Sequence, residues 1–323
     1  MDVKLRPNAW EEYIGQASIK KNLQILLEAA SGRHEPIEHI LLHGPAGLGK
    51  TTLAHLIAKE AKAGIKITSG PTIERVGDLA SILTNMSAGE ILFIDEVHRL
   101  NKLIEEVLYS AMESRSLNII IGKGPSARTI QLELSPFTLI AATTRISLLS
   151  SPLRSRFAGG IYRLNFYNTD ELEKILDRSA KILNIDVQPE ARKEIAKRSR
   201  STPRIANHLL KRCRDFAQIN NKNILDLDAA KATFKLLEID EVGLEPADRR
   251  ILETLIEKFN GGPVGLQTLA AATSEEEGTI EEVYEPYLIQ LGFLERTPRG
   301  RVATAHAYEH LGAKTPPQQN KLL

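Results

Sequence analysis

The sequence of 323 residues contains a single cysteine, Cys213. One cysteine excludes a disulfide framework within the chain and a zinc site built from several cysteines. Aromatic residues are also scarce, at 5% of the chain, and the formal net charge is only +1. So small a net charge gives no overall attraction to nucleic acid. Any such binding must come from a local cluster of basic residues.

Long apolar runs are absent as well. No stretch is long enough to cross a membrane, and residues 1–6 lack the apolar segment of a secretory signal. We therefore expect a cytoplasmic protein without a membrane partner. The hydrophobic share of 42% and the charged share of 26% are typical of a globular chain, and the length suits two or three domains.

Residues 44–51 read GPAGLGKT, between the apolar run at 39–42 and a helical pattern at 52–59. This strand, loop and helix context is what a phosphate-binding loop requires. Glycines let the backbone turn its N–H groups around a phosphate, and the following helix points its positive end at the same place. Lys50 would reach the β- and γ-phosphates and Thr51 would bind Mg²⁺. We expect a nucleoside triphosphate with Mg²⁺ as the bound species.

The run ILFIDE at residues 91–96 predicts a buried strand that ends in two acids. Asp95 would bind the magnesium shell, and Glu96 would orient and deprotonate the attacking water. Two acids after an apolar run can also mark a solvated turn. Beside a phosphate loop, the second acid favours hydrolysis of the nucleotide over phosphoryl transfer to a metabolite.

The chain pattern predicts an α/β fold, a parallel sheet with helices on both faces, followed by two smaller domains. Candidate strands lie at 40–42, 65–68, 91–94, 138–142 and 161–164, within a nucleotide-binding domain of residues 1–165. Continuous helical periodicity with breaks at Pro189 and Pro203 predicts a small helical domain at 166–241.

Three short helices, at 247–259, 266–272 and 280–290, and a hairpin at 292–304 predict a winged helix-turn-helix over residues 242–313. Residues 314–323 are polar, and we expect them to be disordered.

The order of these motifs resembles that of the AAA+ ATPases. The string EPYLIQLGFLERTPRGR at residues 285–301 is similar to the RuvB family of bacterial Holliday-junction branch-migration motors, and the resemblance runs from residue 5 to about residue 312. It implies an ATP-driven homo-hexameric ring on duplex DNA that migrates Holliday junctions with RuvA in recombination and repair, with RuvC as a further partner.

The resemblance also implies the site residues. The adenine pocket would be formed by Leu5, Arg6, Tyr13, Ile14 and Tyr167. The phosphates would be held by Gly47, Leu48, Gly49, Lys50, Thr51 and Thr52.

Two further residues would act as sensors, and a third would act as an arginine finger. Thr144 would be a polar sensor at a strand tip, and Arg204, directly after Pro203, would sense the γ-phosphate from the helical lid. Arg156 would be the arginine finger offered to the adjacent subunit, with Arg154 as the weaker candidate. The segment at 158–160 is one residue longer than the common form of the family, directly behind the proposed finger.

The wing is the expected DNA contact. The third helix, at 280–290, carries acids such as Glu285 that would repel phosphates. The following turn carries Arg296, Arg299 and Arg301, which we expect to bind backbone phosphates without reading sequence. An ordinary exposed turn is the alternative.

A hairpin is predicted near residues 116–135. Its residues Ile119, Ile120 and Ile121 leave more apolar surface than one buried face can use, and in the family this hairpin docks onto RuvA. A hairpin packed on its own domain is an equal alternative.

Two other functions stay open at this point: another DNA-associated AAA+ ATPase, such as a clamp loader or initiator, and an ATP-dependent regulator without motor activity. The basic wing argues against a clamp loader.

Overall fold

The computed structural model describes residues 3–121, 128–220 and 224–314. The chain divides into two units, one of residues 1–44 and 48–165 and the other of residues 45–47 and 166–323. The tail expected to be disordered lies outside the described residues, apart from Lys314. In the described part of the chain, no helix is both long and apolar enough to span a membrane.

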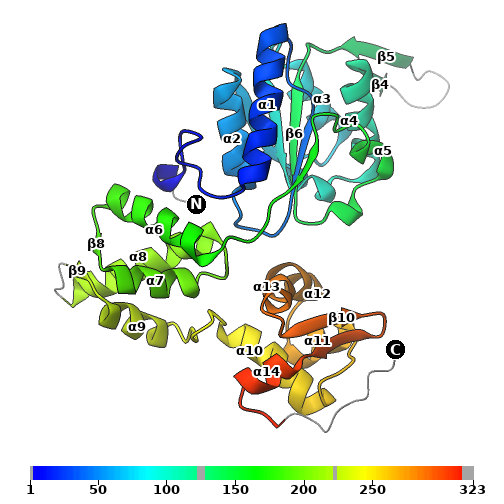
Figure 1. The fold of residues 1–323 in the computed structure, drawn as a ribbon. Coiled ribbons are helices and arrows are strands. Elements are labelled where there is room, and N and C mark those ends of the chain that lie inside the picture. Colours follow the sequence, from blue (N-terminus) through cyan, green and yellow to red (C-terminus); the bar gives the residue numbers. More distant parts are fainter. Residues whose placement is uncertain (1–2, 122–127, 221–223, 315–323) are drawn as a thin grey trace. The chain divides into compact units, whose positions relative to one another are not determined.

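The first unit is built on a five-stranded parallel sheet in the order β2-β3-β6-β1-β7 (Figure 1). All residues of β6 and the apolar residues of β1 and β3 are buried, as their continuous apolar runs predict. All five predicted strands are confirmed, as β1 (Ile40–His43), β2 (Ile65–Ser69), β3 (Ile91–Asp95), β6 (Thr138–Thr143) and β7 (Ile161–Arg163).

Helices cover both faces of this sheet. Figure 1 shows α1 and α2 on one side of the strands and α3 and α4 on the other. On the second side, Leu79 of α3 and Leu108 of α4 share a core with Leu92 and Leu139 of the sheet. The helices are α1 (Ala17–Arg33), α2 (Lys50–Glu60), α3 (Val76–Thr84), α4 (Lys102–Ser114) and α5 (Ser151–Arg154), with short 3₁₀ turns η1 (Val3–Leu5), η2 (Gly70–Thr72), η3 (Val97–Arg99) and η5 (Ile146–Leu148).

The predicted hairpin is present. Strands β4 (Ser116–Ile121) and β5 (Arg128–Glu133) pair antiparallel, and Ile119 lies opposite Ile130. The backbone of residues 119–121 is described, whereas their side chains lie outside the described part of the chain.

The second unit begins with a helical lid. Its first helix starts with a capping box: the Asn168 side chain accepts from the Glu171 N–H at 2.8 Å, and Glu171 accepts from the Asn168 N–H at 3.0 Å. The helices are α6 (Thr169–Leu183), α7 (Pro189–Lys197), α8 (Pro203–Ile219) and α9 (Leu227–Leu236), with a short parallel pair β8 (Asp186–Val187) and β9 (Ile224–Leu225). The helix starts at Pro189 and Pro203 confirm the sequence prediction.

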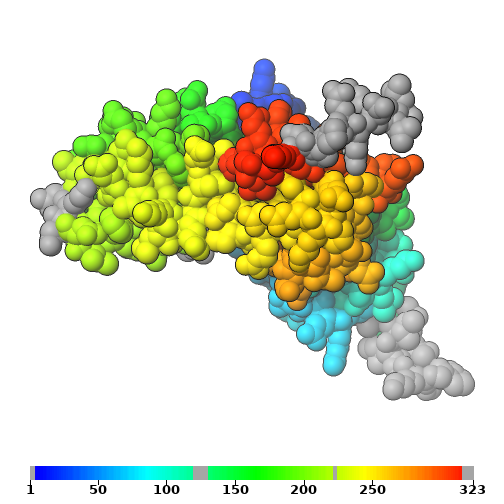
Figure 2. All heavy atoms as spheres, turned by 90° about the horizontal axis from the view of Figure 1, so that it is seen from below, coloured from blue at the N-terminus to red at the C-terminus, as the bar shows by residue number. Residues whose placement is uncertain are grey.

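A winged helix follows the lid. It contains α10 (Pro246–Glu253) with a π-helical turn η6 (Thr254–Lys258), α11 (Leu266–Thr273), α12 (Glu277–Thr279), a second π-helical turn η7 (Ile280–Tyr284), α13 (Glu285–Gln290), the hairpin β10 (Leu294–Thr297) and β11 (Gly300–Ala303), and α14 (Ala305–His310). Helix α14 was not predicted. Its Ala307 and Tyr308 complete a core with Leu252, Leu269 and Leu288, and Figure 2 shows this red helix against the yellow part of the winged helix.

A buried ion pair joins the lid to the winged helix within this unit. The Arg200 guanidinium binds the Asp248 carboxylate, and their side chains are only 6% and 0% exposed. Arg200 also lies 4.8 Å from the centroid of the Tyr287 ring and donates to the Val283 carbonyl at 3.3 Å. Burial raises the pKa of the Asp248 carboxyl, and the Arg200 charge opposes that shift.

We expect removal of Arg200 to destabilise the second unit strongly, because Asp248 then remains buried without its counter-charge. Arg200→Met should lower the free energy of unfolding by about 3–5 kcal/mol, measured by urea denaturation followed by circular dichroism. The double variant Arg200→Met with Asp248→Asn leaves no unpaired charge and should lose less. Equal losses in both variants would contradict this account.

Candidate functional site

The phosphate loop leaves the carboxyl end of β1 and leads into α2. Gly44 and Gly49 have φ values of +138° and +97°, in the region that favours glycine. A Cβ on Gly44 would lie 2.6 Å from the Leu164 carbonyl oxygen, and one on Gly49 would lie 3.1 Å from the Tyr13 hydroxyl. These glycines therefore allow a close turn whose N–H groups, with those of the first turn of α2, suit a bound phosphate.

Lys50 is the first residue of α2 and is only 7% exposed. Its Nζ donates to the Gly44 carbonyl at 2.7 Å, so the ammonium group is held within the turn of the loop. A bound triphosphate would bring negative charge next to this ammonium group.

Thr51 and Asp95 form the part of the site that fits Mg²⁺. The Thr51 hydroxyl donates to Asp95 Oδ2 at 3.1 Å, and Asp95 Oδ1 accepts from the Glu96 N–H at 3.0 Å. Two hard oxygen atoms, one from the first turn of α2 and one from the end of β3, completed by phosphate oxygens and water, are the ligands that Mg²⁺ prefers. These residues therefore fit the metal that the sequence predicts.

Glu96 is held by the tip of the neighbouring strand. Its φ of +47° turns the chain sharply after β3. Glu96 Oε2 accepts from the Thr144 N–H at 3.2 Å and from the Thr144 hydroxyl at 3.1 Å. Within the described residues, no hydrogen bond reaches Oε1, which leaves this atom for a water molecule. The structure thus brings the two predicted residues Glu96 and Thr144 together.

His98 and Thr143 belong to the same network and were missed by the sequence analysis. His98 Nδ1 lies 3.2 Å from Glu96 Oε2 and 2.9 Å from the Thr143 hydroxyl. The His98 side chain is only 7% exposed. The only sequence signal for it was a histidine two positions after the second acid.

Arg156 makes three contacts within its own unit, and the acid among its partners is exposed. Its Nε donates to Glu113 at 3.1 Å, its Nη1 donates to the Pro152 carbonyl at 2.7 Å, and its guanidinium lies 4.6 Å from the centroid of the Tyr109 ring. The Glu113 side chain is 66% exposed. An ion pair with an exposed acid contributes at most about 1 kcal/mol, so the Glu113 contact alone does not fix Arg156, whose own side chain is 25% exposed.

Hydrogen bonds hold the chain on both sides of Arg156. Glu105 of α4 accepts from the Ser150 N–H at 2.8 Å, which fixes the start of α5. After Phe157, the Gly159 N–H donates to His39 and the Gly160 carbonyl accepts from Leu41, at 2.9 and 3.0 Å. The 158–160 segment is therefore held by hydrogen bonds to β1 and the residue before it, and the chain after Arg156 is anchored there.

The remaining predicted nucleotide residues are divided between the units. In the first, Leu5 and Tyr13 are buried, whereas Arg6 and Ile14 are half-buried. In the second, Tyr167 is buried and its N–H donates to the Ser201 carbonyl at 2.9 Å, close to exposed Arg204. Their roles at the adenine ring and the γ-phosphate stay predictions.

Two titratable side chains, His43 in β1 and Cys213 in α8, carry no charge at pH 7. Burial first, then the charges of Arg163 and Lys50, lowers the pKa of His43 at the end of β1. His43 is therefore neutral at pH 7. Burial raises the pKa of the Cys213 thiol in α8 to about 12, so this thiol stays protonated and unreactive.

The wing arginines do not all point freely to solvent. Glu285 is fully buried, and its carboxylate binds Arg296 Nε at 2.6 Å and Arg301 Nε at 2.7 Å. Arg299 at the tip of the hairpin is exposed. Our expectation that Glu285 repels phosphates therefore does not hold, because two arginines neutralise it.

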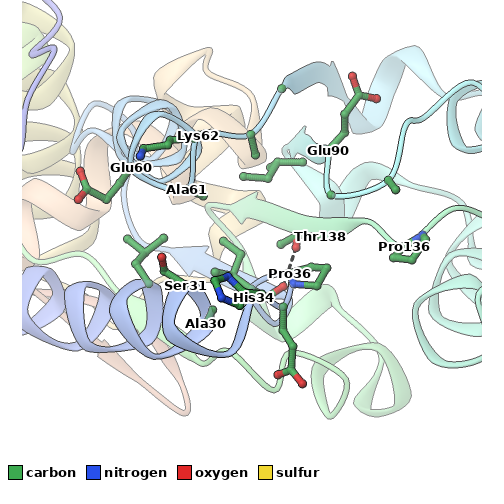
Figure 3. A pocket seen from close by; sticks show the side chains of 18 of the residues that line it. Ala30, Ser31, His34, Pro36, Glu60, Ala61, Lys62, Glu90, Pro136 and Thr138 are labelled. Atoms are coloured by element: carbon green, nitrogen blue, oxygen red, sulfur yellow. Dashed lines mark hydrogen bonds between the residues drawn. The ribbon is translucent and has the colours of Figure 1, made fainter.

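A separate hollow with a volume of about 1070 Å³ lies at the amino ends of the strands (Figure 3). Ile91 and Thr138, the first residues of β3 and β6, line it together with Glu60 and Glu90. The phosphate loop lies at the carboxyl ends. The hollow is therefore separate from the candidate nucleotide site, and its carboxylates do not favour a phosphate.

A parallel sheet with a phosphate loop after β1, the consecutive acids Asp95 and Glu96 at the end of β3 and a helical lid define an AAA+ ATPase, here followed by a winged helix. Comparison with known families narrows this class. Residues 5–164 match the Holliday junction DNA helicase RuvB P-loop domain, residues 167–240 the RuvB AAA lid domain and residues 241–312 the RuvB C-terminal winged helix domain. The chain belongs to the RuvB family.

Solved structures agree with this assignment. The chain is similar to the Thermotoga maritima RuvB Holliday junction branch migration motor, with 50% identity, a TM-score of 0.89, and coverage of 97% of this chain and 100% of that one. A lysine-to-arginine mutant of Thermotoga maritima RuvB matches with 49% identity, a TM-score of 0.90, and coverage of 97% and 99%.

We expect Thr144→Val to slow ATP hydrolysis without weakening nucleotide binding, because Thr144 hydrogen-bonds Glu96, which lies outside the phosphate loop. Loss of one hydrogen bond to a charged group should lower kcat by roughly 10-fold or more. Steady-state ATPase kinetics and fluorescent-nucleotide titration measure the two effects. A large rise in the nucleotide Kd with unchanged kcat would refute the assignment.

Proposed function

We propose that this chain is an ATP-driven motor that forms a homo-hexameric ring on duplex DNA and drives branch migration of Holliday junctions. The observation that carries the proposal is the cluster of Lys50, Thr51, Asp95, Glu96 and Thr144 at one sheet edge, in a chain that also carries a winged helix. Membership of the RuvB family supports the same substrate.

ATP would lie along the phosphate loop, with Lys50 on its β- and γ-phosphates. Mg²⁺ bound by Thr51 and Asp95 would neutralise charge on the phosphate oxygens. Glu96 would take a proton from the attacking water through Oε1, while Thr144 and His98 hold Oε2. The fixed Oε2 orients the carboxylate, so that only one of its oxygens faces the reaction.

The finger in this proposal acts between subunits. Arg156 follows α5, and the acid that it pairs with on its own unit, Glu113, is exposed, so a neighbour's γ-phosphate can compete for it. A site completed in trans requires a ring, which is the reason for proposing a homo-hexamer. Arg204 on the lid would sense the γ-phosphate from the same chain.

DNA contact is assigned to the wing. Arg299 is exposed at its tip and the Arg296 side chain is 45% exposed, whereas that of Arg301 is 15% exposed. Arginines on a hairpin tip bind backbone phosphates and carry no sequence information. Sequence-neutral contacts suit a motor that must move along any duplex.

The β4–β5 hairpin is the proposed docking site for RuvA. Ile130 on β5 is 42% exposed, an apolar side chain left without full cover. RuvC is proposed as a further partner of the assembled complex. The proposal also includes a cytoplasmic location and domains at 1–165, 166–241 and 242–313.

A mixing experiment tests the site between subunits. Lys50→Ala removes the lysine that holds the phosphates, and Arg156→Ala removes the finger, so each variant alone should have little ATPase activity. Mixed rings place an intact phosphate loop beside an intact finger at some interfaces and should recover measurable turnover. If Arg156→Ala alone keeps full activity, the finger is assigned to the wrong residue.

A junction assay tests the motor itself. Glu96→Gln removes the general base but not the metal ligand, so hydrolysis should fall about 10²–10⁴-fold while ATP still binds. Branch migration of a four-way junction in the presence of RuvA should also stop when hydrolysis is lost. Gel analysis of the products measures this. Wild-type protein that hydrolyses ATP but never moves a junction would favour an ATP-dependent regulator.

A further inference from the structure

The wing hairpin places two arginines directly opposite each other. Arg296 on β10 pairs with Arg301 on β11 in the antiparallel register. Like charges at directly opposed positions destabilise a hairpin. A third group must therefore compensate this pair.

Glu285, the first residue of α13, supplies that compensation. Its side chain is 0% exposed, and its two oxygens are shared between the two arginines. Oε2 accepts from Arg296 Nε at 2.6 Å and also contacts Arg296 Nη2, whereas Oε1 accepts from Arg301 Nε at 2.7 Å. One carboxylate thus holds both guanidinium groups from beneath the hairpin.

Each guanidinium keeps N–H donors that make no hydrogen bond within the described residues. Arg301 uses only Nε among the described residues, so both of its Nη groups remain as donors. Arg296 Nη1 forms a looser ion pair with Glu281 at 3.7 Å, longer than a hydrogen bond, and 45% of the Arg296 side chain is exposed, so a phosphate can compete for this edge. A guanidinium carries five N–H donors in a fixed fork, so it can bind a carboxylate on one edge and a phosphate on the other.

We propose that Glu285 is a positioning residue for DNA: it fixes Arg296 and, through it, the phosphate-binding edge of the wing. The inference rests on the proposed DNA-binding function. Arginine has many rotamers in solution, and ordering them before binding reduces the entropic cost of capturing a phosphate. A negative residue thereby increases affinity for a negative polymer.

This role and a purely electrostatic one predict effects of opposite sign. Removing an acid near DNA raises affinity when the acid acts only through its charge. Removing an acid that orients phosphate-binding arginines lowers affinity. Glu285→Gln keeps the shape of the side chain but cannot accept from both guanidinium groups through charged oxygens.

The experiment measures binding of the full-length chain to a 30-base-pair duplex by fluorescence anisotropy, over a series of salt concentrations. Glu285→Gln should weaken binding about 5- to 10-fold at 100 mM salt and lower the salt slope by about one contact. The control Glu295→Gln removes the same charge from an exposed position on β10 and should bind as tightly as wild type or more tightly. Arg299→Gln removes one exposed cation, so its loss of affinity measures the cost of losing a single phosphate contact.

Two further variants separate positioning from folding. Glu285→Asp keeps the charge but shortens the side chain, so a loss of affinity in this variant with an unchanged melting temperature supports positioning. In an Arg296→Gln background, Glu285→Gln should cost much less than it does in wild type, because it acts through Arg296.

The outcomes distinguish this inference from the function on which it rests. Wild-type protein that fails to bind duplex DNA overturns both. Tight wild-type binding, together with Glu285→Gln and Glu285→Asp variants that bind equally tightly or more tightly, overturns only the positioning role. Fully additive losses in the Arg296→Gln background also overturn it.

Discussion

The hydrogen bond between Thr51 and Asp95 is the contact on which the nucleotide site depends. It joins the first turn of α2, which follows β1, to the tip of β3. Strand β6 lies between β1 and β3 in the sheet, so its tip places Thr144 against Glu96. Because parallel strands bring their carboxyl ends to one edge, segments far apart in sequence form one site. Any change in strand order would separate the phosphate loop from Asp95 and Glu96.

Much of the fold follows from the sequence, since the signals are local. Continuous apolar runs predict buried parallel strands, prolines mark the starts of α7 and α8, and the three helices with a hairpin predict a winged helix. Helix α14 could not be predicted in this way. It has six residues and two buried side chains, Ala307 and Tyr308, so its formation depends on the core it completes and has no periodic pattern of its own.

The candidate site shows the same difference between residues with a local sequence signal and residues placed by packing. The motif GPAGLGKT and the pair Asp95–Glu96 carry their chemistry in their spacing, and the fold brings them together. His98, Glu113 and Glu285 act across elements, and their local sequence does not show which side chain faces them. Glu285 is the clearest case. Its position on an acidic helix predicts an exposed charge, whereas packing beneath the hairpin gives it two arginines and no solvent.

The environment of Cys213 has a practical consequence for fluorescence labelling of this protein. It is the only thiol in the chain, and it is buried in α8 with a pKa of about 12. The native sequence therefore behaves toward maleimide dyes as though it had no cysteine. A single cysteine introduced on the wing or on α5 can carry a fluorophore without any change to the lid, so movement of the labelled element can be recorded in otherwise unaltered protein.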